Sequence, residues 1–156
     1  MSPIPPFVAA LRSRVGHDLL WIPGVTAVVV RDGAVLLTRR ADTGAWAPVT
    51  GILDPGEEPA IGAAREALEE CGVVVRVDRL ASVSATPEVL HVNGDRSVYL
   101  DLTFACSWVE GEARVADDEN LEVAWWPLTQ LPPMAPDLVA RIEAAVSGEV
   151  AARFLS

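Results

Sequence analysis

Apolar and polar residues alternate in short blocks along the chain, and most of these blocks predict β-strands. The β-branched run at residues 25–30 and the apolar run at 34–38 flank Asp32-Gly33, a pair typical of a tight hairpin turn. Asn93-Gly94 indicates a second turn between apolar runs. The other strand-like runs cover residues 46–49, 73–77, 80–84, 98–108 and 121–126.

Three segments have the apolar spacing of helices instead. A short amphipathic stretch covers residues 7–15, follows a proline-rich start and ends at Gly16. A central helix is predicted over residues 59–71, because Pro59 suits a first helical position and Gly72 suits the position just after a helix. The segment 51–58 before it reads as a loop. A closing helix covers residues 137–146.

This order of strands, one central helix, further strands and one terminal helix predicts an α/β fold with a mixed sheet covered by helices. We expect residues 1–20 to form an N-terminal helical segment, residues 21–147 to form a single domain, and residues 148–156 to be a tail that frays.

The central helix separates apolar from acidic positions. A stripe made of Ile61, Ala64, Leu68 and Cys71 is predicted to pack on the sheet, with Glu66, Glu69 and Glu70 roughly opposite. Like charges at this spacing repel by about 0.2–0.5 kcal/mol per pair, whereas a divalent cation would reverse the sign. Oxygen ligands at this density suit Mg²⁺ or Mn²⁺. Arg65, four residues before Glu69, either forms a surface ion pair or holds a metal-binding carboxylate in place.

Charge and cysteine content narrow the function classes. The 156-residue chain has a formal net charge of −10 and 51% hydrophobic residues. We therefore expect it to bind neither nucleic-acid polymers nor anionic membranes, although small phosphorylated ligands can bind where a metal ion bridges the charges. The two cysteines form no disulfide framework, and no signal peptide or membrane span is evident, which favours the cytoplasm.

The segment 51–73 resembles the Nudix box, G-x5-E-x7-R-E-U-x-E-E-x-G-U, where U is a bulky apolar residue. The defined positions fall on Gly51, Glu57, Arg65, Glu66, Ala67, Glu69, Glu70, Gly72 and Val73, and only Ala67 departs, because it is small. Two further stretches, LLTRRADTGAW at 36–46 and DENLEVAWWPL at 118–128, are similar to the segments that flank the box in MutT-like members. The resemblance covers about residues 24–132.

The resemblance implies a Nudix fold, with a mixed sheet between helices and the box as a loop-helix-loop. It also implies Mg²⁺-dependent hydrolysis, with Mn²⁺ as a substitute, of a nucleoside diphosphate linked to another moiety. Glu69 and Glu70 would be the main metal ligands, and Glu66 a ligand or the base. Glu57 would be a ligand or an outer partner, and Arg65 would orient the carboxylates. The carbonyl of Thr50 can also bind metal.

The substrate contacts and the general base come from outside the box. By resemblance, Arg40 faces the substrate phosphates; its alternative role is a surface charge at the end of a strand. Trp46 either stacks on a base or packs in the fold. The general base is Glu66, Glu119 or Glu122. We favour Glu119 over Glu122, because Glu122 lies within a strand-like run. The alternative for residues 117–119 is a plain acidic turn.

Several functions fit the resemblance. A (d)NTP pyrophosphohydrolase is favoured by the TRRA run, and an ADP-ribose or nucleotide-sugar pyrophosphatase is the alternative, with Pro87 near the place of a proline typical of ADP-ribose members. A non-catalytic nucleotide-sensing module would be a different class. An isopentenyl diphosphate isomerase is disfavoured, since it needs a cysteine before the acidic helix and none precedes Cys71. A homodimer is a candidate assembly, with the N-terminal segment as its candidate contact, and the sequence does not decide it.

Overall fold

A seven-stranded mixed sheet organises the structure, a computed structural model that describes residues 4–156. In chain order the elements are α1 (Pro6–Val15), β1 (Leu20–Arg31), β2 (Ala34–Arg40), β3 (Trp46–Ile52), α2 (Pro59–Cys71), β4 (Val74–Ala85), β5 (Val89–Leu90), β6 (Arg96–Glu110), β7 (Asn120–Pro127) and α3 (Pro136–Val146). Residues 1–3 of the predicted N-terminal segment lie outside the described residues.

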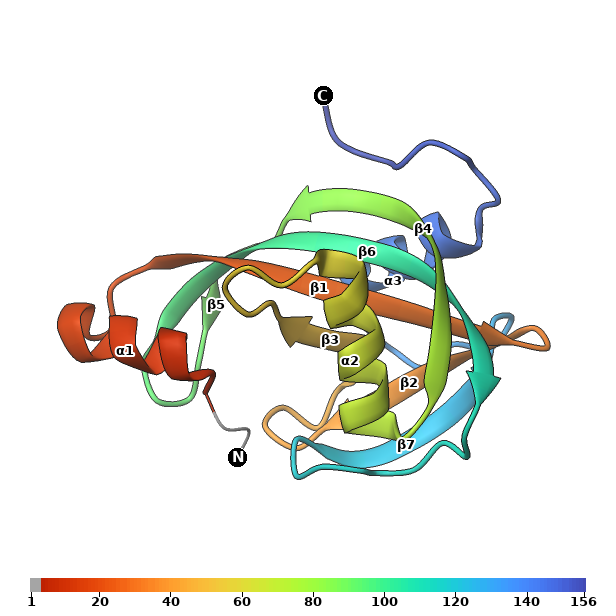
Figure 1. Ribbon diagram of the computed structural model, residues 1–156, viewed down its shortest axis with the longest axis horizontal. Coiled ribbons are helices and arrows are strands. Elements are labelled where there is room, and N and C mark those ends of the chain that lie inside the picture. Colours follow the sequence, from red (N-terminus) through yellow and green to blue (C-terminus); the bar gives the residue numbers. More distant parts are fainter. Residues whose placement is uncertain (1–3) are drawn as a thin grey trace.

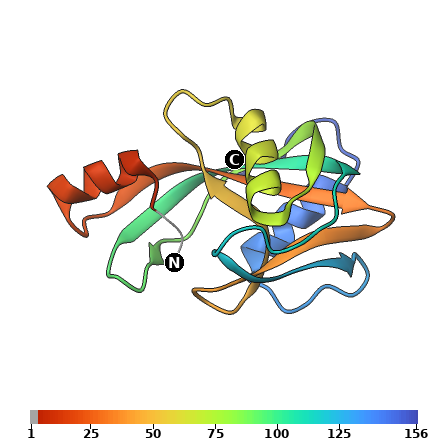
Figure 2. The ribbon, with the colours of Figure 1, turned by 60° about the horizontal axis from the view of Figure 1, so that its bottom comes forward.

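The strands lie in the order β4-β6-β1-β3-β2-β7, with β5 paired to β6. The central pair, β1 and β6, is parallel from Leu20↔Ser97 to Val30↔Ser107, and the other pairs are antiparallel. Helix α2 covers one face and α3 the other, while α1 lies at one end beside β5 (Figure 1; Figure 2). The predicted α/β fold with a mixed sheet between helices is confirmed.

Alternate residues of β1 divide the core into two clusters. Val25, Ala27 and Val29 face the cluster beneath α2, whereas Val28 faces the cluster that contains Ile142 of α3. This period of two is what a strand buried on both faces requires. Both faces of the sheet are therefore covered by helices.

The predicted apolar stripe of α2 is wrong at three of its four positions. The side chains buried against the sheet are Ala63, Ala67 and Cys71, each 0% exposed, whereas Ile61 is 64% and Leu68 52% exposed. Small side chains allow the helix to approach the sheet closely, because each removes bulk from the contact. Ile61, Ala64 and Leu68 instead line a shallow apolar groove with Val74 and Val75.

Three boundaries also differ from those predicted. The runs at 73–77 and 80–84 belong to the single strand β4, whose register shifts at Val77/Arg79 and Leu80/Ser82 interrupt the alternation that the sequence pattern shows. Strand β3 continues to Ile52, so the first two residues of the predicted loop are strand residues. In the tail, Arg153 forms backbone hydrogen bonds with Ala81 and Val83 at 2.9 and 3.0 Å, so this part of the tail does not fray.

Helix α3 is attached to the sheet by a buried ion pair. Nη1 of Arg141 lies 3.1 Å from Oγ1 of Thr26 and 3.4 Å from Oδ1 of Asp101, and Asp101 also accepts a hydrogen bond from Thr103. These groups sit on the face opposite α2, where they hold α3 in place. Within residues 4–156, no helix is long and apolar enough to span a bilayer.

Candidate active site

Helix α2 presents its acidic side chains beside the end of β3. Glu58 precedes the helix in an extended conformation, and Pro59 begins it. Gly72 ends the helix in the left-handed conformation, with φ 70° and ψ 17°, and its N–H donates to the carbonyl of Leu68. These boundaries confirm the predicted helix. They place Glu66 and Glu70 one turn apart on the same side of the helix.

Glu66 lies directly against Gly51 of β3. A β-carbon at Gly51 would be 2.1 Å from Cδ and 2.2 Å from Oε1 of Glu66, which is far inside van der Waals contact. The glycine that opens the box is therefore required for close approach of a carboxylate to the strand. It is not required for a turn, because Gly51 is absent from the residues with positive φ.

Arg65 contacts three of the acidic residues. Its Nε and Nη2 donate to the two oxygens of Glu57 at 2.7 and 2.9 Å. Its Nη1 donates to Oε1 of Glu66 at 2.8 Å and to Oε2 of Glu69 at 3.0 Å. A planar guanidinium provides these donors in a fixed arrangement. Arg65 thus joins Glu57, Glu66 and Glu69 through hydrogen bonds.

Glu57 has both carboxylate oxygens engaged within the protein. Besides the fork from Arg65, its Oε2 accepts the backbone N–H of Asp54 at 3.0 Å. Arg65 lowers the pKa of Glu57 mainly through the side-chain hydrogen bond, against the effect of burial. Of the two roles expected for Glu57, this geometry favours the outer partner that anchors Arg65.

The carbonyl of Thr50 opens on an unpaired edge of β3. Strand β2 pairs only with residues 46–48 of β3, so Thr50 and Ile52 have β1 on one side alone. The N–H of Leu53 donates to Pro23 of β1, and the carbonyl of Ile52 accepts from Arg65 at 3.4 Å on the other side. Because alternate carbonyls of a strand point the same way, that of Thr50 faces the same edge as that of Ile52.

Glu70 is the most deeply buried acidic residue of the site, at 3% exposure. Its Oε2 accepts a hydrogen bond from Nδ2 of Asn120 at 2.9 Å. Its Oε1 is buried and has no hydrogen-bond partner among the described residues. Oxygens of Glu70, Asp117 and Glu119 all lie within 4.8 Å of one another. A buried carboxylate oxygen without a donor is costly in water-excluded surroundings, and a cation would compensate it.

The segment that carries Asp117 and Glu119 is fixed to the end of α2. The N–H groups of Arg114 and Ala116 donate to the carbonyls of Cys71 and Glu70 at 3.0 and 3.1 Å. Such carbonyls at a helix end lack partners within the helix. The N–H of Glu119 donates to Oδ1 of Asp117 at 3.1 Å. The late acidic residues are thus held against the box by backbone hydrogen bonds.

Burial and mutual repulsion raise the pKa values of this group. Burial raises the pKa of Glu66 to about 7, with Glu69 and Glu119 adding to the rise and Arg65 opposing it. Burial raises the pKa of Glu70 to about 8, with Glu119, Glu66 and Asp117 adding to it and the Asn120 hydrogen bond opposing it. Burial also raises the pKa of Asp117. Glu66 and Glu70 therefore release their protons close to neutral pH, and the two titrations are linked because the charge of Glu66 raises the pKa of Glu70.

The donor set fits a hard divalent cation. It consists of carboxylate oxygens, one of them buried and unpartnered, together with a backbone carbonyl at an open strand edge. Mg²⁺ and Mn²⁺ prefer such oxygen ligands. Both cysteines are buried in the core, so no thiolate joins the set. The residues present therefore suit the expected metal by chemistry as well as by position.

Arg40 lies on the same side of the sheet as Glu70. Its partner across β2 and β7 is Asn120, which contacts Glu70. Its Nε and Nη2 donate to Asp42 at 3.0 and 2.9 Å. Burial lowers the pKa of Arg40, but the Asp42 hydrogen bond and the charges of Asp42, Glu70 and Glu119 give a net rise. Arg40 is therefore within electrostatic reach of the acidic group, as a phosphate-binding residue would be.

Trp46 and Glu122 lie on the side of the sheet opposite Glu70. Trp46 packs edge-on against Trp126, with ring centroids 5.3 Å apart, in the cluster that faces α3. Glu122 forms an ion pair of 2.8 Å with Arg39 and alternates with Val123, which faces the cluster beneath α2. The expected stacking of Trp46 on a base is thus not supported, and the packing alternative describes it. Glu122 is not among the carboxylates grouped with Glu70.

Two residues of the site, Asp117 and Asn120, could not be identified from the sequence. The sequence indicates Asp117 only as part of an acidic stretch with two interpretations, and it indicates no role for Asn120. A signal for Asn120 existed, since it immediately precedes the strand-like run and follows Glu119. Its contact with Glu70 could not be inferred, because it depends on how β7 lies beneath α2.

Comparisons with known proteins agree with this geometry. A family model described as the NUDIX domain matches residues 21–146. A MutT-like protein of Streptomyces ambofaciens is 39% identical over 65% of this chain and 60% of its own length. An ADP-ribose pyrophosphatase of Methanocaldococcus jannaschii is 27% identical over 72% of this chain and 66% of its own length. The match thus spans less than two thirds of each of these relatives.

Solved structures show the same fold. The MutT NUDIX hydrolase from Burkholderia pseudomallei superposes with a TM-score of 0.65 and 27% identity, covering 81% of this chain and 99% of that one. An ADP-ribose pyrophosphatase from Streptococcus suis superposes with a TM-score of 0.64 and 22% identity, covering 85% of this chain and 98% of that one. The second likeness, at this identity, bears on the fold alone.

Proposed function

The chain belongs to the Nudix hydrolase family, and from that premise we propose that it is a divalent-metal-dependent pyrophosphohydrolase of small nucleotides. The observation that carries the proposal is the buried, unpartnered Oε1 of Glu70 within a group of carboxylates. A merely solvated acidic face would not bury one of its oxygens without a donor. Glu70 belongs both to the box and to this group, whereas Asp117 and Glu119 come from outside the box.

We assign the metal to Glu66, Glu69 and Glu70, with the carbonyl of Thr50 as a further ligand and Glu57 as the anchor of Arg65. When bound, Mg²⁺ supplies charge neutralisation of phosphate oxygens and lowers the pKa of bound water. The raised pKa values of Glu66 and Glu70 mean that these carboxylates are partly protonated at neutral pH without metal. Asp117 lies close enough to Glu70 to add a ligand or stabilise one.

The chain's own residues then perform the proton transfer and bind the phosphates. Glu119 accepts a proton from the attacking water while the oxygen of that water forms a bond to phosphorus. The bond from phosphorus to the bridging oxygen breaks, and the departing phosphate keeps the electron pair. Arg40 offsets the negative charge of the phosphates from the β2 side. Glu66 stays the alternative base, since its pKa is near 7.

A (d)NTP is our first candidate substrate. Arg40 of the TRRA run lies on the side of the acidic group, and a relative with 39% identity is named MutT-like. ADP-ribose is the second candidate, with nucleotide sugars as a variant of it, because a relative that matches 72% of the chain is named an ADP-ribose pyrophosphatase. Both candidates share the anhydride and the nucleoside monophosphate product.

A non-catalytic sensing module is the competing class. It is disfavoured because all box carboxylates are present and Arg65 holds three of them in contact. The cytoplasm and the lack of binding to nucleic-acid polymers stay predictions from charge and cysteine content, and the homodimer stays a candidate assembly through the N-terminal segment. Sedimentation of the purified protein tests the homodimer, and a polymer-binding assay tests the lack of nucleic-acid binding.

A substrate panel with Mg²⁺ or Mn²⁺ tests the proposal. The eight common (d)NTPs, ADP-ribose and nucleotide sugars are incubated with the protein, and phosphate, pyrophosphate and nucleoside monophosphate are separated. We expect monophosphate from at least one nucleotide, with pyrophosphate as the second product of a (d)NTP. Absence of turnover across the panel, with binding of a nucleotide retained, would support the sensing module.

A further inference from the structure

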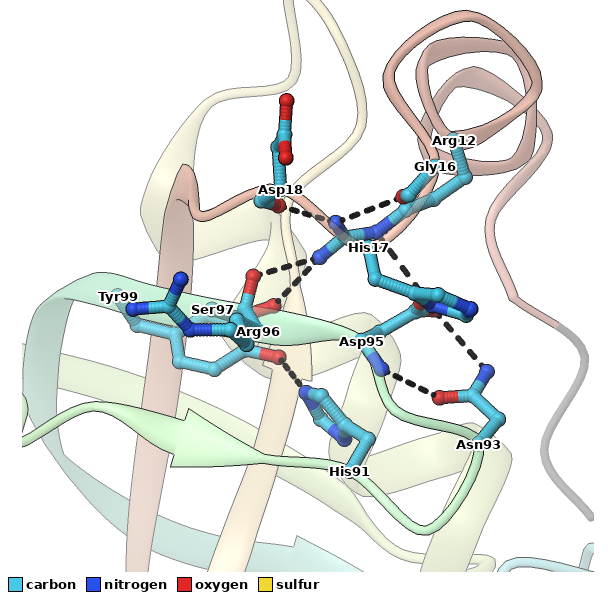
Figure 3. Close-up of polar contacts among 10 residues, drawn as sticks. All are labelled: Arg12, Gly16, His17, Asp18, His91, Asn93, Asp95, Arg96, Ser97 and Tyr99. Atoms are coloured by element: carbon cyan, nitrogen blue, oxygen red, sulfur yellow. Dashed lines mark hydrogen bonds and ion pairs between the residues drawn. The ribbon is translucent and has the colours of Figure 1, made fainter.

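A cluster of polar contacts joins α1 to the hairpin formed by β5 and β6 (Figure 3). Nη2 of Arg12 donates to the carbonyl of Arg96 at 2.7 Å and to Oγ of Ser97 at 3.2 Å. Its Nε lies 3.5 Å from Asp95, and the side chain of Arg12 is only 9% exposed. A largely buried arginine with these partners fixes two segments that are distant in sequence.

The tip of the hairpin is held by the same cluster. Asp95 contacts Nδ1 of His17 at 2.8 Å and Nδ2 of Asn93 at 3.0 Å. The backbone N–H of His91 donates to the carbonyl of Asp95 at 2.8 Å. Because β5 contains only two residues, its own ladder is short, and these contacts define where His91 lies.

His91 and Tyr99 form a pair on this hairpin. The hydroxyl of Tyr99 lies 3.2 Å from Nε2 of His91. Reciprocal bonds with Thr86, both 2.9 Å, fix the backbone of Tyr99. The ring lies beside Gly24 of β1, where a β-carbon would be 3.6 Å from Cδ1 of Tyr99. Tyr99 is half-buried, so its hydroxyl and the imidazole keep room for further hydrogen bonds.

The pair lies close to the candidate active site. The β-carbon position of Gly24 is 3.5 Å from the carbonyl oxygen of Gly51, and Gly51 lies against Glu66. Tyr99 and Glu66 approach opposite faces of the β1–β3 pair, since Gly24 pairs with Ile52 rather than with Gly51. The two side chains are thus linked through Gly24 and Gly51, and the Thr50 carbonyl faces the unpaired edge of β3.

Electrostatics indicate the same proximity. Burial raises the pKa of Tyr99, and the positive charges of Arg40 and Arg12 oppose that rise. Arg40 also acts on Glu70 and Glu119. The positive charge of Arg40 therefore acts on both the acidic group and Tyr99.

We propose that Tyr99 and His91 bind the nucleoside part of the substrate through neutral hydrogen bonds, and that the Arg12–Asp95 contact positions them. This inference rests on the proposed function. A tyrosine hydroxyl and an imidazole can donate to and accept from ribose hydroxyls or base-edge atoms, and neither requires a charged partner. They supply the neutral recognition that the acidic group and Arg40, both charged, do not.

The chain contains one tyrosine and two histidines, which makes this proposal testable by nuclear magnetic resonance. With isotope-labelled tyrosine and histidine, the Tyr99 signal is single, and His17 serves as the reference for His91. The protein is titrated with AMP, GMP, CMP and UMP, with ribose 5-phosphate and with inorganic phosphate, each in Mg²⁺. None of these contains an anhydride, so binding is measured without turnover.

We expect at least one nucleoside monophosphate to shift the Tyr99 and His91 signals more than that of His17, and inorganic phosphate to shift neither. Equal shifts with ribose 5-phosphate would identify the ribose hydroxyls as the partners, whereas shifts with the nucleotide alone would identify the base. No shift at Tyr99 with any nucleotide up to 10-fold above the highest substrate KM would overturn the proposal.

Variants provide the second measurement. Tyr99→Phe keeps the ring and removes the hydroxyl, and we expect roughly 3–10-fold weaker nucleotide binding, the size of one net hydrogen bond. Arg12→Gln should weaken nucleotide binding similarly with inorganic phosphate binding unchanged, whereas Arg14→Gln on the same helix should leave both unchanged. Wild-type nucleotide affinity in Tyr99→Phe contradicts this inference alone, while nucleotide binding without hydrolysis contradicts the proposed function alone.

Discussion

Asn120 donates a hydrogen bond of 2.9 Å to Glu70 and so joins the start of β7 to α2 across 50 positions of the chain. The bond occupies Oε2 of Glu70, and the other oxygen is left without a partner among the described residues. The amide therefore fixes which oxygen of Glu70 is available to a cation. Such outer contacts orient metal ligands and commonly affect metal affinity or activity 10–100-fold.

Replacing Asn120 by alanine tests this relationship. Asn120→Ala removes the donor and leaves both oxygens of Glu70 buried without partners, so we expect Mn²⁺ affinity and turnover to fall about 10–100-fold. Gln130→Ala, at an exposed amide in the turn after β7, is the control and should behave as wild type. Unchanged Mn²⁺ binding in Asn120→Ala, measured by calorimetry, would separate the amide from the metal site.

Asp117 and Asp118 offer a matched pair of neighbouring acids. Asp117 lies within the group around Glu70, whereas Asp118 is exposed and outside that group. We expect Asp117→Asn to weaken Mn²⁺ binding several-fold and Asp118→Asn to have little effect. Equal effects of the two substitutions would mean that only general negative charge matters there.

Gly51→Ala tests the close contact with Glu66. The backbone of Gly51 does not require glycine, but the new methyl would lie 2.1 Å from the Glu66 carboxyl carbon. We expect a folded protein with a displaced Glu66 and turnover at least about 10-fold lower. Because Glu66→Asp draws the carboxylate back, the double variant should lose less than the sum of the two single losses. Strict additivity of the two losses would argue against a direct contact.

Stability without metal should fall as the pH rises. Burial raises the pKa of Glu66 to about 7 and of Glu70 to about 8, from an ordinary value of 4.5. Between these limits the unfolded chain has released protons that the folded chain retains, so folding becomes less favourable with increasing pH. Each kcal/mol lost lowers the Tm by about 2–4 °C in a chain of this size.

Thermal unfolding from pH 5 to pH 9 measures this effect. In EDTA, the Tm should fall from pH 5 to about pH 8 and then level off, and Glu70→Gln should reduce the slope because it removes one of the titrating groups. Added Mg²⁺ should raise the Tm most at high pH, where the carboxylates bind metal in their ionised form. A Tm in EDTA that increases steadily toward pH 9 would contradict the raised pKa values.

Local sequence signals predicted the ends of α2 better than they predicted which of its residues are buried. Pro59 and Gly72 mark the ends of α2 because a helix start and a helix stop each depend on one residue's backbone preference. The buried face of α2 was predicted wrongly, because hydrophobicity favours Ile61 and Leu68 while the contact with the sheet requires the small Ala63 and Ala67. The register shifts in β4 similarly interrupt its alternating pattern, so the sequence predicts two strands where the structure has one.

In the site, too, contacts between residues close in sequence were predicted better than contacts between distant segments. Positions within the box are close in sequence, and Arg65 contacts Glu57, Glu66 and Glu69 within one helix and its preceding loop. The contribution of Asp117 and Asn120 depends on backbone bonds between residues 114–116 and the end of α2, which no local pattern encodes. The position of Trp46 depends on which side of β3 faces α3.

The hydrolysis of a nucleotide anhydride by wild type and Glu70→Gln, in Mg²⁺ and at matched unfolding temperature, tests the account most directly. Gln keeps the size and the contact with Asn120 but removes the charge that a cation requires. We predict that wild type releases a nucleoside monophosphate and that Glu70→Gln is slower by orders of magnitude while it remains folded. Near-wild-type turnover by Glu70→Gln would contradict the account.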